Sequence, residues 1–112
     1  MLISEIIFED IQLAKNGTFD NAMSKMLNGY NNGLSHTHDT CYAYVGAHLA
    51  EIDPPDAVIR LWGLKASGLI VHGDALLPDG EVISDMPTDK YSKRGYELVR
   101  TITYKQLRGM LH

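Results

Sequence analysis

Residues 68–85 read Gly-Leu-Ile-Val-His-Gly-Asp-Ala-Leu-Leu-Pro-Asp-Gly-Glu-Val-Ile-Ser-Asp. Residues 69–71 are apolar and rich in β-branched side chains, and Val82-Ile83 repeats that composition after the turn sequence Pro78-Asp79-Gly80. Two short apolar runs on either side of such a turn predict a β-hairpin. The second half of the chain is therefore expected to contain antiparallel strands.

A third strand is expected after the hairpin. Residues 86–95 are mostly polar and charged, which is typical of a solvated connection. Residues 96–104 predict a strand with four side chains on one alternating face, namely Tyr96, Leu98, Ile102 and Tyr104. Thr103 can cap a short C-terminal helix that continues through Leu111.

The first part of the chain has helical spacing. Residues 2–14 carry apolar side chains at intervals of three and four, which predicts a first helix. A second helix is expected over residues 19–27, capped by Thr18 and ended at Gly29. Residues 30–40 are polar and aperiodic, so they are interpreted as a loop.

A further helix is expected to begin at Cys41, with Asp39 or Thr40 as its N-cap. Its apolar face would carry Cys41, Val45, His48, Leu49 and Ile52. Two prolines follow this helix, and residues 53–62 are interpreted as a short new helix. A strand in that stretch is the alternative.

Helices first and antiparallel strands after predict an α+β fold, with N-terminal helices packed on a small antiparallel sheet in one domain of residues 1–112. The chain has 112 residues, of which 45% are hydrophobic, and a formal net charge of −4. This composition suits one ordinary core. The acidic balance argues against nucleic acid as a partner. No apolar run approaches the ~18 residues of a membrane span, and no basic leader is seen, so a cytoplasmic protein is expected.

The chemistry of the sequence centres on Cys41, the single cysteine, which excludes an intramolecular disulfide. In the first turn of a helix, the macrodipole is expected to lower the pKa of this thiol, and its own backbone N–H is a free donor. A nucleophilic thiol also needs a base within hydrogen-bond reach. His72, on the first strand of the predicted hairpin, is the candidate.

The group that orients His72 depends on the hairpin turn. A two-residue turn at Asp79-Gly80 makes Asp85 a diagonal neighbour of His72. A three-residue turn shifts the parity by one and places Ser84 on that face instead.

The order of Cys41, His72 and Asp85 resembles the core of the transglutaminase-like and papain-like cysteine hydrolases. The common features are a cysteine at a helix start, a strand histidine about thirty residues later, and an aspartate after a Pro-Asp-Gly turn. The resemblance covers residues 39–104. It implies a minimal papain-like or transglutaminase-like core.

The resemblance implies an enzyme, either a cysteine peptidase or amidase or a transglutaminase-like acyltransferase. Cys41 would attack an amide, isopeptide or thioester carbonyl, His72 would protonate the leaving group, and Asp85 would hold the imidazolium. Hydrolysis and acyl transfer both remain open, and no cofactor is expected. The side-chain donor to the oxyanion remains open among Asn31, Asn32 and His38.

The expected substrate is a peptide or another amide-containing molecule. The chain is too short for the extra lobe that usually walls a peptide cleft, which leaves a homodimer or a partner protein to complete the groove.

Two other readings of the same residues stay open. A lone cysteine on an apolar helix face also suits a structural role in a non-enzymatic interaction or regulatory protein. The cluster of His36, His38 and Asp39 could instead bind Zn²⁺, with His48 or His72 completing the site.

Overall fold

The computed structural model describes residues 17–33, 41–64 and 67–110. Within these residues a four-stranded antiparallel sheet has the strand order β3-β2-β1-β4. The elements in chain order are α2 (Phe19–Asn32), α3 (Cys41–Ile52), β1 (Val58–Leu64), β2 (Ile70–Leu76), β3 (Val82–Ile83), α4 (Lys90–Lys93), β4 (Tyr96–Thr103) and α5 (Tyr104–Gly109).

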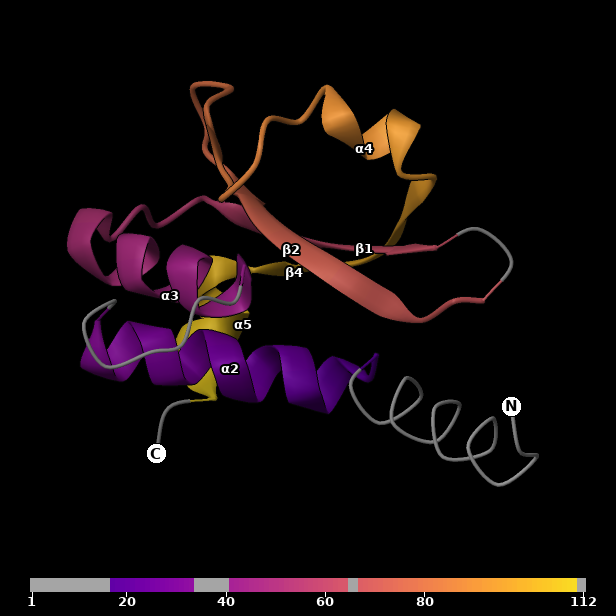
Figure 1. Ribbon diagram of the computed structural model, residues 1–112. Coiled ribbons are helices and arrows are strands. Elements are labelled where there is room, and N and C mark those ends of the chain that lie inside the picture. The colour runs from indigo at the N-terminus through magenta and orange to yellow at the C-terminus, as the bar shows by residue number, and fades with distance from the viewer. Residues whose placement is uncertain (1–16, 34–40, 65–66, 111–112) are drawn as a thin grey trace.

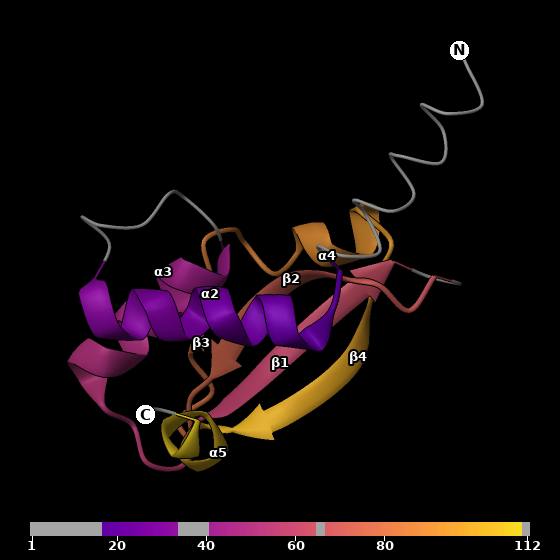
Figure 2. The same cartoon turned by 90° about the horizontal axis from the view of Figure 1, so that it is seen from below.

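The helices lie on both sides of this sheet. α2 and α3 cover one face, which we call the inner face, and α4 lies over the opposite, outer face (Figure 1). The view from below shows α2 running across the sheet and β4 forming its edge (Figure 2). The predicted α+β class, with helices packed on a small antiparallel sheet, is confirmed. The helix predicted over residues 2–14 lies outside the described residues.

α2 begins where the sequence predicts and ends later. The Thr18 side chain accepts the N–H of Asn21 at 3.2 Å, which confirms the predicted N-cap. The predicted end at Gly29 is wrong, because the helix continues to Asn32 and stops at Gly33, which has a φ of 72°. Gly29 is buried in the crossing with α3, where a Cβ would overlap the backbone of Ala43.

Gly46 of α3 makes the matching close approach. A Cβ at this position would overlap the carbonyl oxygen of Met26 in α2, and backbone cannot rotate away as a side chain can. Gly46→Ala must therefore separate the two helices, and we expect it to lower the free energy of unfolding by about 1–3 kcal/mol, the usual cost of overpacking.

Urea unfolding measures this cost, and Gly109→Ala is the matched control. Gly109 lies in the last turn of α5 with open space around its Cβ position, so the same change there is expected to be neutral or slightly stabilising. Equal stabilities of the two variants would contradict the close crossing of α2 and α3.

β1 replaces the short helix that was predicted for residues 53–62, and the alternative of a strand is the one that is confirmed. The burial alternates along the strand, with Ile59 and Leu61 fully buried on the inner face and Arg60 and Trp62 on the outer face. This two-residue period and the β-branched residues favour a strand over a helix, because β2 and β4 lie on either side of the segment and pair with it.

The predicted hairpin forms as β2 and β3, with a three-residue turn. Leu77 N–H donates to the Glu81 carbonyl at 2.8 Å, so the turn consists of residues 78–80. Gly80 has a φ of 94°, a conformation that favours glycine. The register pairs Ala75 with Ile83, which is the parity that places Ser84 on the face of His72.

The segment over residues 86–95 is not only a solvated connection. It contains α4, and Tyr91 of this helix is buried against the outer face of the sheet at 6% exposure. The charged neighbours of Tyr91 hide this contact in the sequence.

The strand predicted over residues 96–104 is confirmed as β4, with the capping box of Thr103 and Gln106 at the start of α5. The predicted common face of β4 is only partly correct. Ile102 is buried, whereas Leu98 is 50% exposed, because the pairing of β1 with β4 contains an irregularity near Trp62 and β4 is an edge strand.

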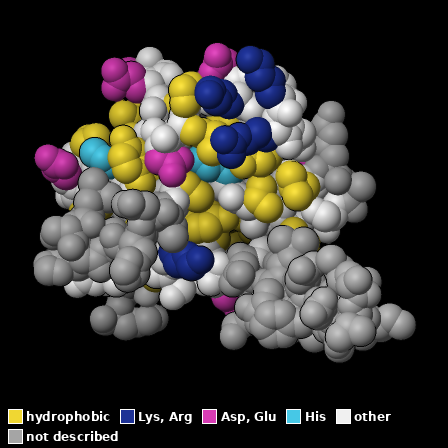
Figure 3. Space-filling model, viewed as in Figure 1, with side chains coloured by type: hydrophobic (Ala, Val, Ile, Leu, Met, Phe, Trp, Pro, Cys, Tyr) yellow, Lys and Arg dark blue, Asp and Glu magenta, His cyan; other side chains and the backbone are white. Residues whose placement is uncertain are grey.

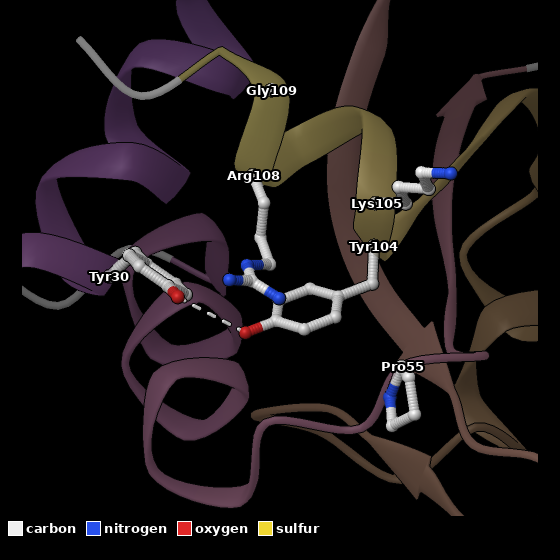
Figure 4. Close-up of a pocket in the computed structure, with 6 residues that line it drawn as sticks. All are labelled: Tyr30, Pro55, Tyr104, Lys105, Arg108 and Gly109. Carbon is white, nitrogen blue, oxygen red and sulfur yellow. Dashed lines mark hydrogen bonds between the residues drawn. The ribbon is translucent and has the colours of Figure 1, made fainter.

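α5 is fixed to the helices through Tyr104. The Tyr104 hydroxyl donates to Asp53 Oδ1 at 2.8 Å and lies 3.2 Å from the Tyr30 hydroxyl of α2. Tyr30 and Tyr104 line a cavity of about 510 Å³ between α2 and α5 (Figure 4). No described helix is long and apolar enough to cross a bilayer.

Candidate functional site

Cys41 lies at the start of α3, as predicted, and packs against the edge of β2. The N–H of Gly73 in β2 hydrogen-bonds its sulfur, together with the N–H groups of Tyr42 and of Cys41 itself. β3 pairs with β2 only at Ala75 and Leu76, so the thiol takes a donor of β2 that lies beyond the end of β3. The start of α3 is thereby attached to the residue that follows His72.

The protonation state of this thiol differs from the prediction. The pKa of Cys41 is raised to about 11, mainly by burial and less by the nearby charge of Asp85, while the three N–H groups lower it less than burial raises it. The expected lowered pKa is therefore wrong, because the cost of burying a thiolate exceeds what the helix N-terminus contributes. Cys41 is a neutral thiol near neutral pH.

This result predicts slow alkylation of Cys41. The thiol pKa rises from 9.0 to about 11, so the reactive thiolate is about 100-fold rarer at neutral pH than in an unperturbed thiol. We expect the rate with iodoacetamide to be correspondingly low and to keep rising with pH up to about 11. The measurement is a pH series on the native protein, with the unfolded protein in urea as the control. A plateau below pH 9 in the native protein would contradict the burial of the thiol.

His72 lies on the outer face of β2 and is 1% exposed. Its Nδ1 lies 3.8 Å from Oδ1 of Asp85, so the structure brings together two of the three predicted catalytic residues. Its Nε2 lies 2.9 Å from the Tyr91 hydroxyl and 3.2 Å from Ser84 Oγ. The ring also stacks on Tyr96, with the centroids 5.7 Å apart.

The imidazole of His72 is neutral near neutral pH. Burial lowers its pKa, and the positive charge of Arg94 lowers it further, against the opposing charges of Asp85 and Asp74. Lysine and arginine side chains gather over α4 in the space-filling view (Figure 3). The exposed cations there are Lys90, Lys93 and Arg94.

Asp74 forms a buried polar network beside His72 that sequence reasoning missed. Its carboxylate is fully buried and accepts from Arg60 Nε at 2.7 Å and Nη2 at 2.9 Å, from Trp62 Nε1 at 3.1 Å, and from the Tyr91 hydroxyl at 2.7 Å. The two-residue period of a strand does place Asp74 on the face of His72, and that was the available signal.

Cys41 and His72 approach from different sides of β2. Gly73 faces Tyr42 of α3, and the neighbouring His72 therefore faces the outer side. Among the described residues no hydrogen bond joins the thiol to the imidazole. The negative charge of Asp85 nevertheless acts on both Cys41 and His72. His72 and Gly73, whose N–H acts on the thiol, are thus consecutive residues in the middle of β2.

Asp85 also borders a hollow in the surface. A cavity of about 540 Å³ is lined by Ser84, Asp85 and the residues that follow them up to Thr88. Thr88 and Val82 also line a second cavity of about 410 Å³, whose wall includes Trp62 and Tyr96. These hollows give the outer face room for a ligand next to Asp85.

The remaining candidates from the sequence are the possible zinc ligands and the possible side-chain donors to the oxyanion. His36, His38 and Asp39 lie outside the described residues, and the described ranges contain no cluster of three or more possible metal ligands. The amide of Asn32 is bound to Asn28 of its own helix at 2.6 Å. The described N–H groups that act on the thiol are those of Gly73, Tyr42 and Cys41.

Comparisons of the chain with models of protein families, with curated proteins and with solved structures find no match.

Proposed function

We propose that the protein is a cysteine hydrolase or acyltransferase with a minimal papain-like or transglutaminase-like core. It would act on an amide, isopeptide or thioester bond through an acyl-enzyme. The observation that carries the proposal is the grouping at β2. There the Cys41 sulfur accepts the N–H of Gly73, and Nδ1 of the preceding His72 lies 3.8 Å from Asp85 Oδ1. A thiol, an imidazole and a carboxylate are the groups that such chemistry requires.

The reaction begins from a neutral thiol and a neutral imidazole. As the Cys41 sulfur bonds to the carbonyl carbon, its proton would pass to His72 through a bridging water, because no hydrogen bond joins the two side chains in the described residues, and the carbonyl oxygen becomes an oxyanion. The backbone N–H groups of Cys41 and Tyr42, which act on the sulfur in the free protein, would bind this oxyanion. His72 then gives the proton to the departing amine or thiol, and the acyl group remains on sulfur. Asp85 stabilises the imidazolium in between, and water or an amine releases the acyl group.

A non-enzymatic protein with a structural cysteine is the second candidate. The pKa of about 11 for Cys41 supports it, because inert buried thiols have raised pKa values. The structure is compatible with both functions, which differ in whether the thiol of Cys41 is ever acylated.

Turnover of three acyl donors tests the proposal: p-nitrophenyl acetate, a peptide thioester and a peptide p-nitroanilide. We expect release from at least one donor by the wild type, and none above background by Cys41→Ala or Cys41→Ser. The serine variant keeps the size of the side chain, so loss of turnover in it is not a packing effect. Turnover that survives both substitutions would overturn the proposal. A folded wild type that is inactive on all three donors would favour the structural role.

A further inference from the structure

We infer that Tyr91, held by Asp74, fixes the His72 proton on Nε2 and so leaves Nδ1 as the basic nitrogen of the site. Tyr91 and Asp74 are then positioning residues for the imidazole. The inference deepens the proposed function and rests on it for its catalytic meaning. The tautomer itself follows from hydrogen-bond geometry alone.

The first step concerns the proton of Tyr91. A carboxylate is an acceptor only, and the Asp74 carboxylate lies 2.7 Å from the Tyr91 hydroxyl while the Arg60 guanidinium compensates its charge. Burial also raises the pKa of Tyr91, so the hydroxyl keeps its proton. The one proton of this hydroxyl is therefore donated to Asp74.

The second step concerns His72. Because the Tyr91 proton points at Asp74, its oxygen can only accept from other neighbours. Nε2 of His72 lies 2.9 Å from that oxygen, and this contact is a hydrogen bond only if Nε2 carries a proton. With the proton on Nδ1 instead, two lone pairs would face each other in a buried site. Ser84 Oγ, 3.0 Å from the same oxygen, supplies the second donor.

This assignment decides between two possible nucleophiles. Ser84 Oγ lies 3.2 Å from Nε2, and Asp85 lies on the Nδ1 side, which is the layout of a Ser-His-Asp triad. A protonated Nε2 cannot accept the proton of a serine. The free lone pair is on Nδ1, because Asp85, at 3.8 Å and 35% exposed, is beyond hydrogen-bond distance and is reached by solvent. The charge of Asp85 also acts on Cys41. The network therefore favours the thiol over the serine.

The ring is held in this orientation by its neighbours. The His72 ring meets the edge of Tyr91 at a centroid distance of 5.0 Å and stacks on Tyr96 at 5.7 Å. Trp62 also packs on Tyr91, with the ring centroids 5.0 Å apart, and its Nε1–H donates to the Asp74 carboxylate. A half-turn of the His72 ring, which would exchange the positions of Nδ1 and Nε2, would disturb these aromatic contacts.

Long-range ¹H–¹⁵N correlation NMR of histidine-labelled protein tests the inference without any substrate. At slightly alkaline pH we expect the Nε2–H tautomer of His72 to exceed the Nδ1–H form by about tenfold. Tyr91→Phe removes the acceptor, and it is expected to lower this ratio by a similar factor. Tyr44→Phe is the matched control, since Tyr44 packs on His48 and not on His72, and should leave the ratio unchanged.

A wild-type His72 in the Nδ1–H form would overturn the inference, and so would an unchanged ratio in a folded Tyr91→Phe variant. If that variant does not fold, the wild-type tautomer and Ser84→Ala decide. Ser84→Ala is expected to keep the proton on Nε2. A switch to the Nδ1–H form in this variant would show that Ser84, and not Tyr91, determines the tautomer of His72. An Nε2–H tautomer in a protein that never acylates Cys41 would refute the proposed function and leave the positioning network intact.

Discussion

Asp74→Ala is expected to lower the free energy of unfolding by about 3–5 kcal/mol, the cost of removing one partner from a buried ion pair. Four hydrogen bonds end on this carboxylate. Without it, the donors of Trp62 and Tyr91 lose a buried acceptor, and the guanidinium of Arg60, only 20% exposed, loses its counter-charge. The substitution therefore removes the polar centre of the outer face.

Urea unfolding near neutral pH measures this loss. Asp89→Ala is the control, because Asp89 precedes α4, is exposed and makes no side-chain hydrogen bond to cap it. It is expected to change stability by no more than about 0.5 kcal/mol, as surface substitutions usually do. Equal stabilities of the two variants would mean that the network contributes little to the fold.

His72→Gln is expected to lower kcat/KM for an activated ester by about 10²–10⁴-fold, the usual contribution of a general base. The effect should be large here because the thiol is neutral, so attack depends on a group that takes its proton. Glutamine keeps a polar side chain that can hydrogen-bond Tyr91 but cannot accept the proton of a thiol near neutral pH.

Release of p-nitrophenolate measures this effect, and His48→Gln is the matched control. His48 lies on α3, the helix that carries Cys41, and packs on Tyr44 rather than on β2. We expect wild-type rates from it. Similar rates in the two glutamine variants would show that the imidazole of His72 takes no part in the reaction.

The parts of the fold that the sequence predicted well depend on local patterns. The start of α2 after its Thr18 cap and the hairpin with its Pro-Asp-Gly turn follow from caps and turn residues within a few positions. The end of α2 could not be read in this way. Glycine often ends a helix, so Gly29 was interpreted as a stop. Only the crossing with α3 shows that this glycine instead allows the close contact with the backbone of Ala43.

The site was less predictable, because its properties arise from packing between distant segments. The pKa of Cys41 depends on burial against β2, which the helix position alone does not reveal. Tyr91 is enclosed by charged residues in the sequence, and its contact with Asp74 spans 17 positions. Asp85 was predicted as the partner of His72 from a two-residue turn, yet the observed three-residue turn brings both Ser84 and Asp85 near the ring.

Intact-mass spectrometry after mixing with p-nitrophenyl acetate shows whether Cys41 is acylated. Cys41 is the only cysteine, so one acetyl group that is removed by hydroxylamine and maps to the peptide of Cys41 identifies the acyl-enzyme. We expect this adduct to form faster in the folded wild type than in His72→Gln or in the urea-unfolded chain. A thiol that stays unmodified while exposed lysines are acetylated, or that reacts no faster than in the unfolded chain, would contradict it.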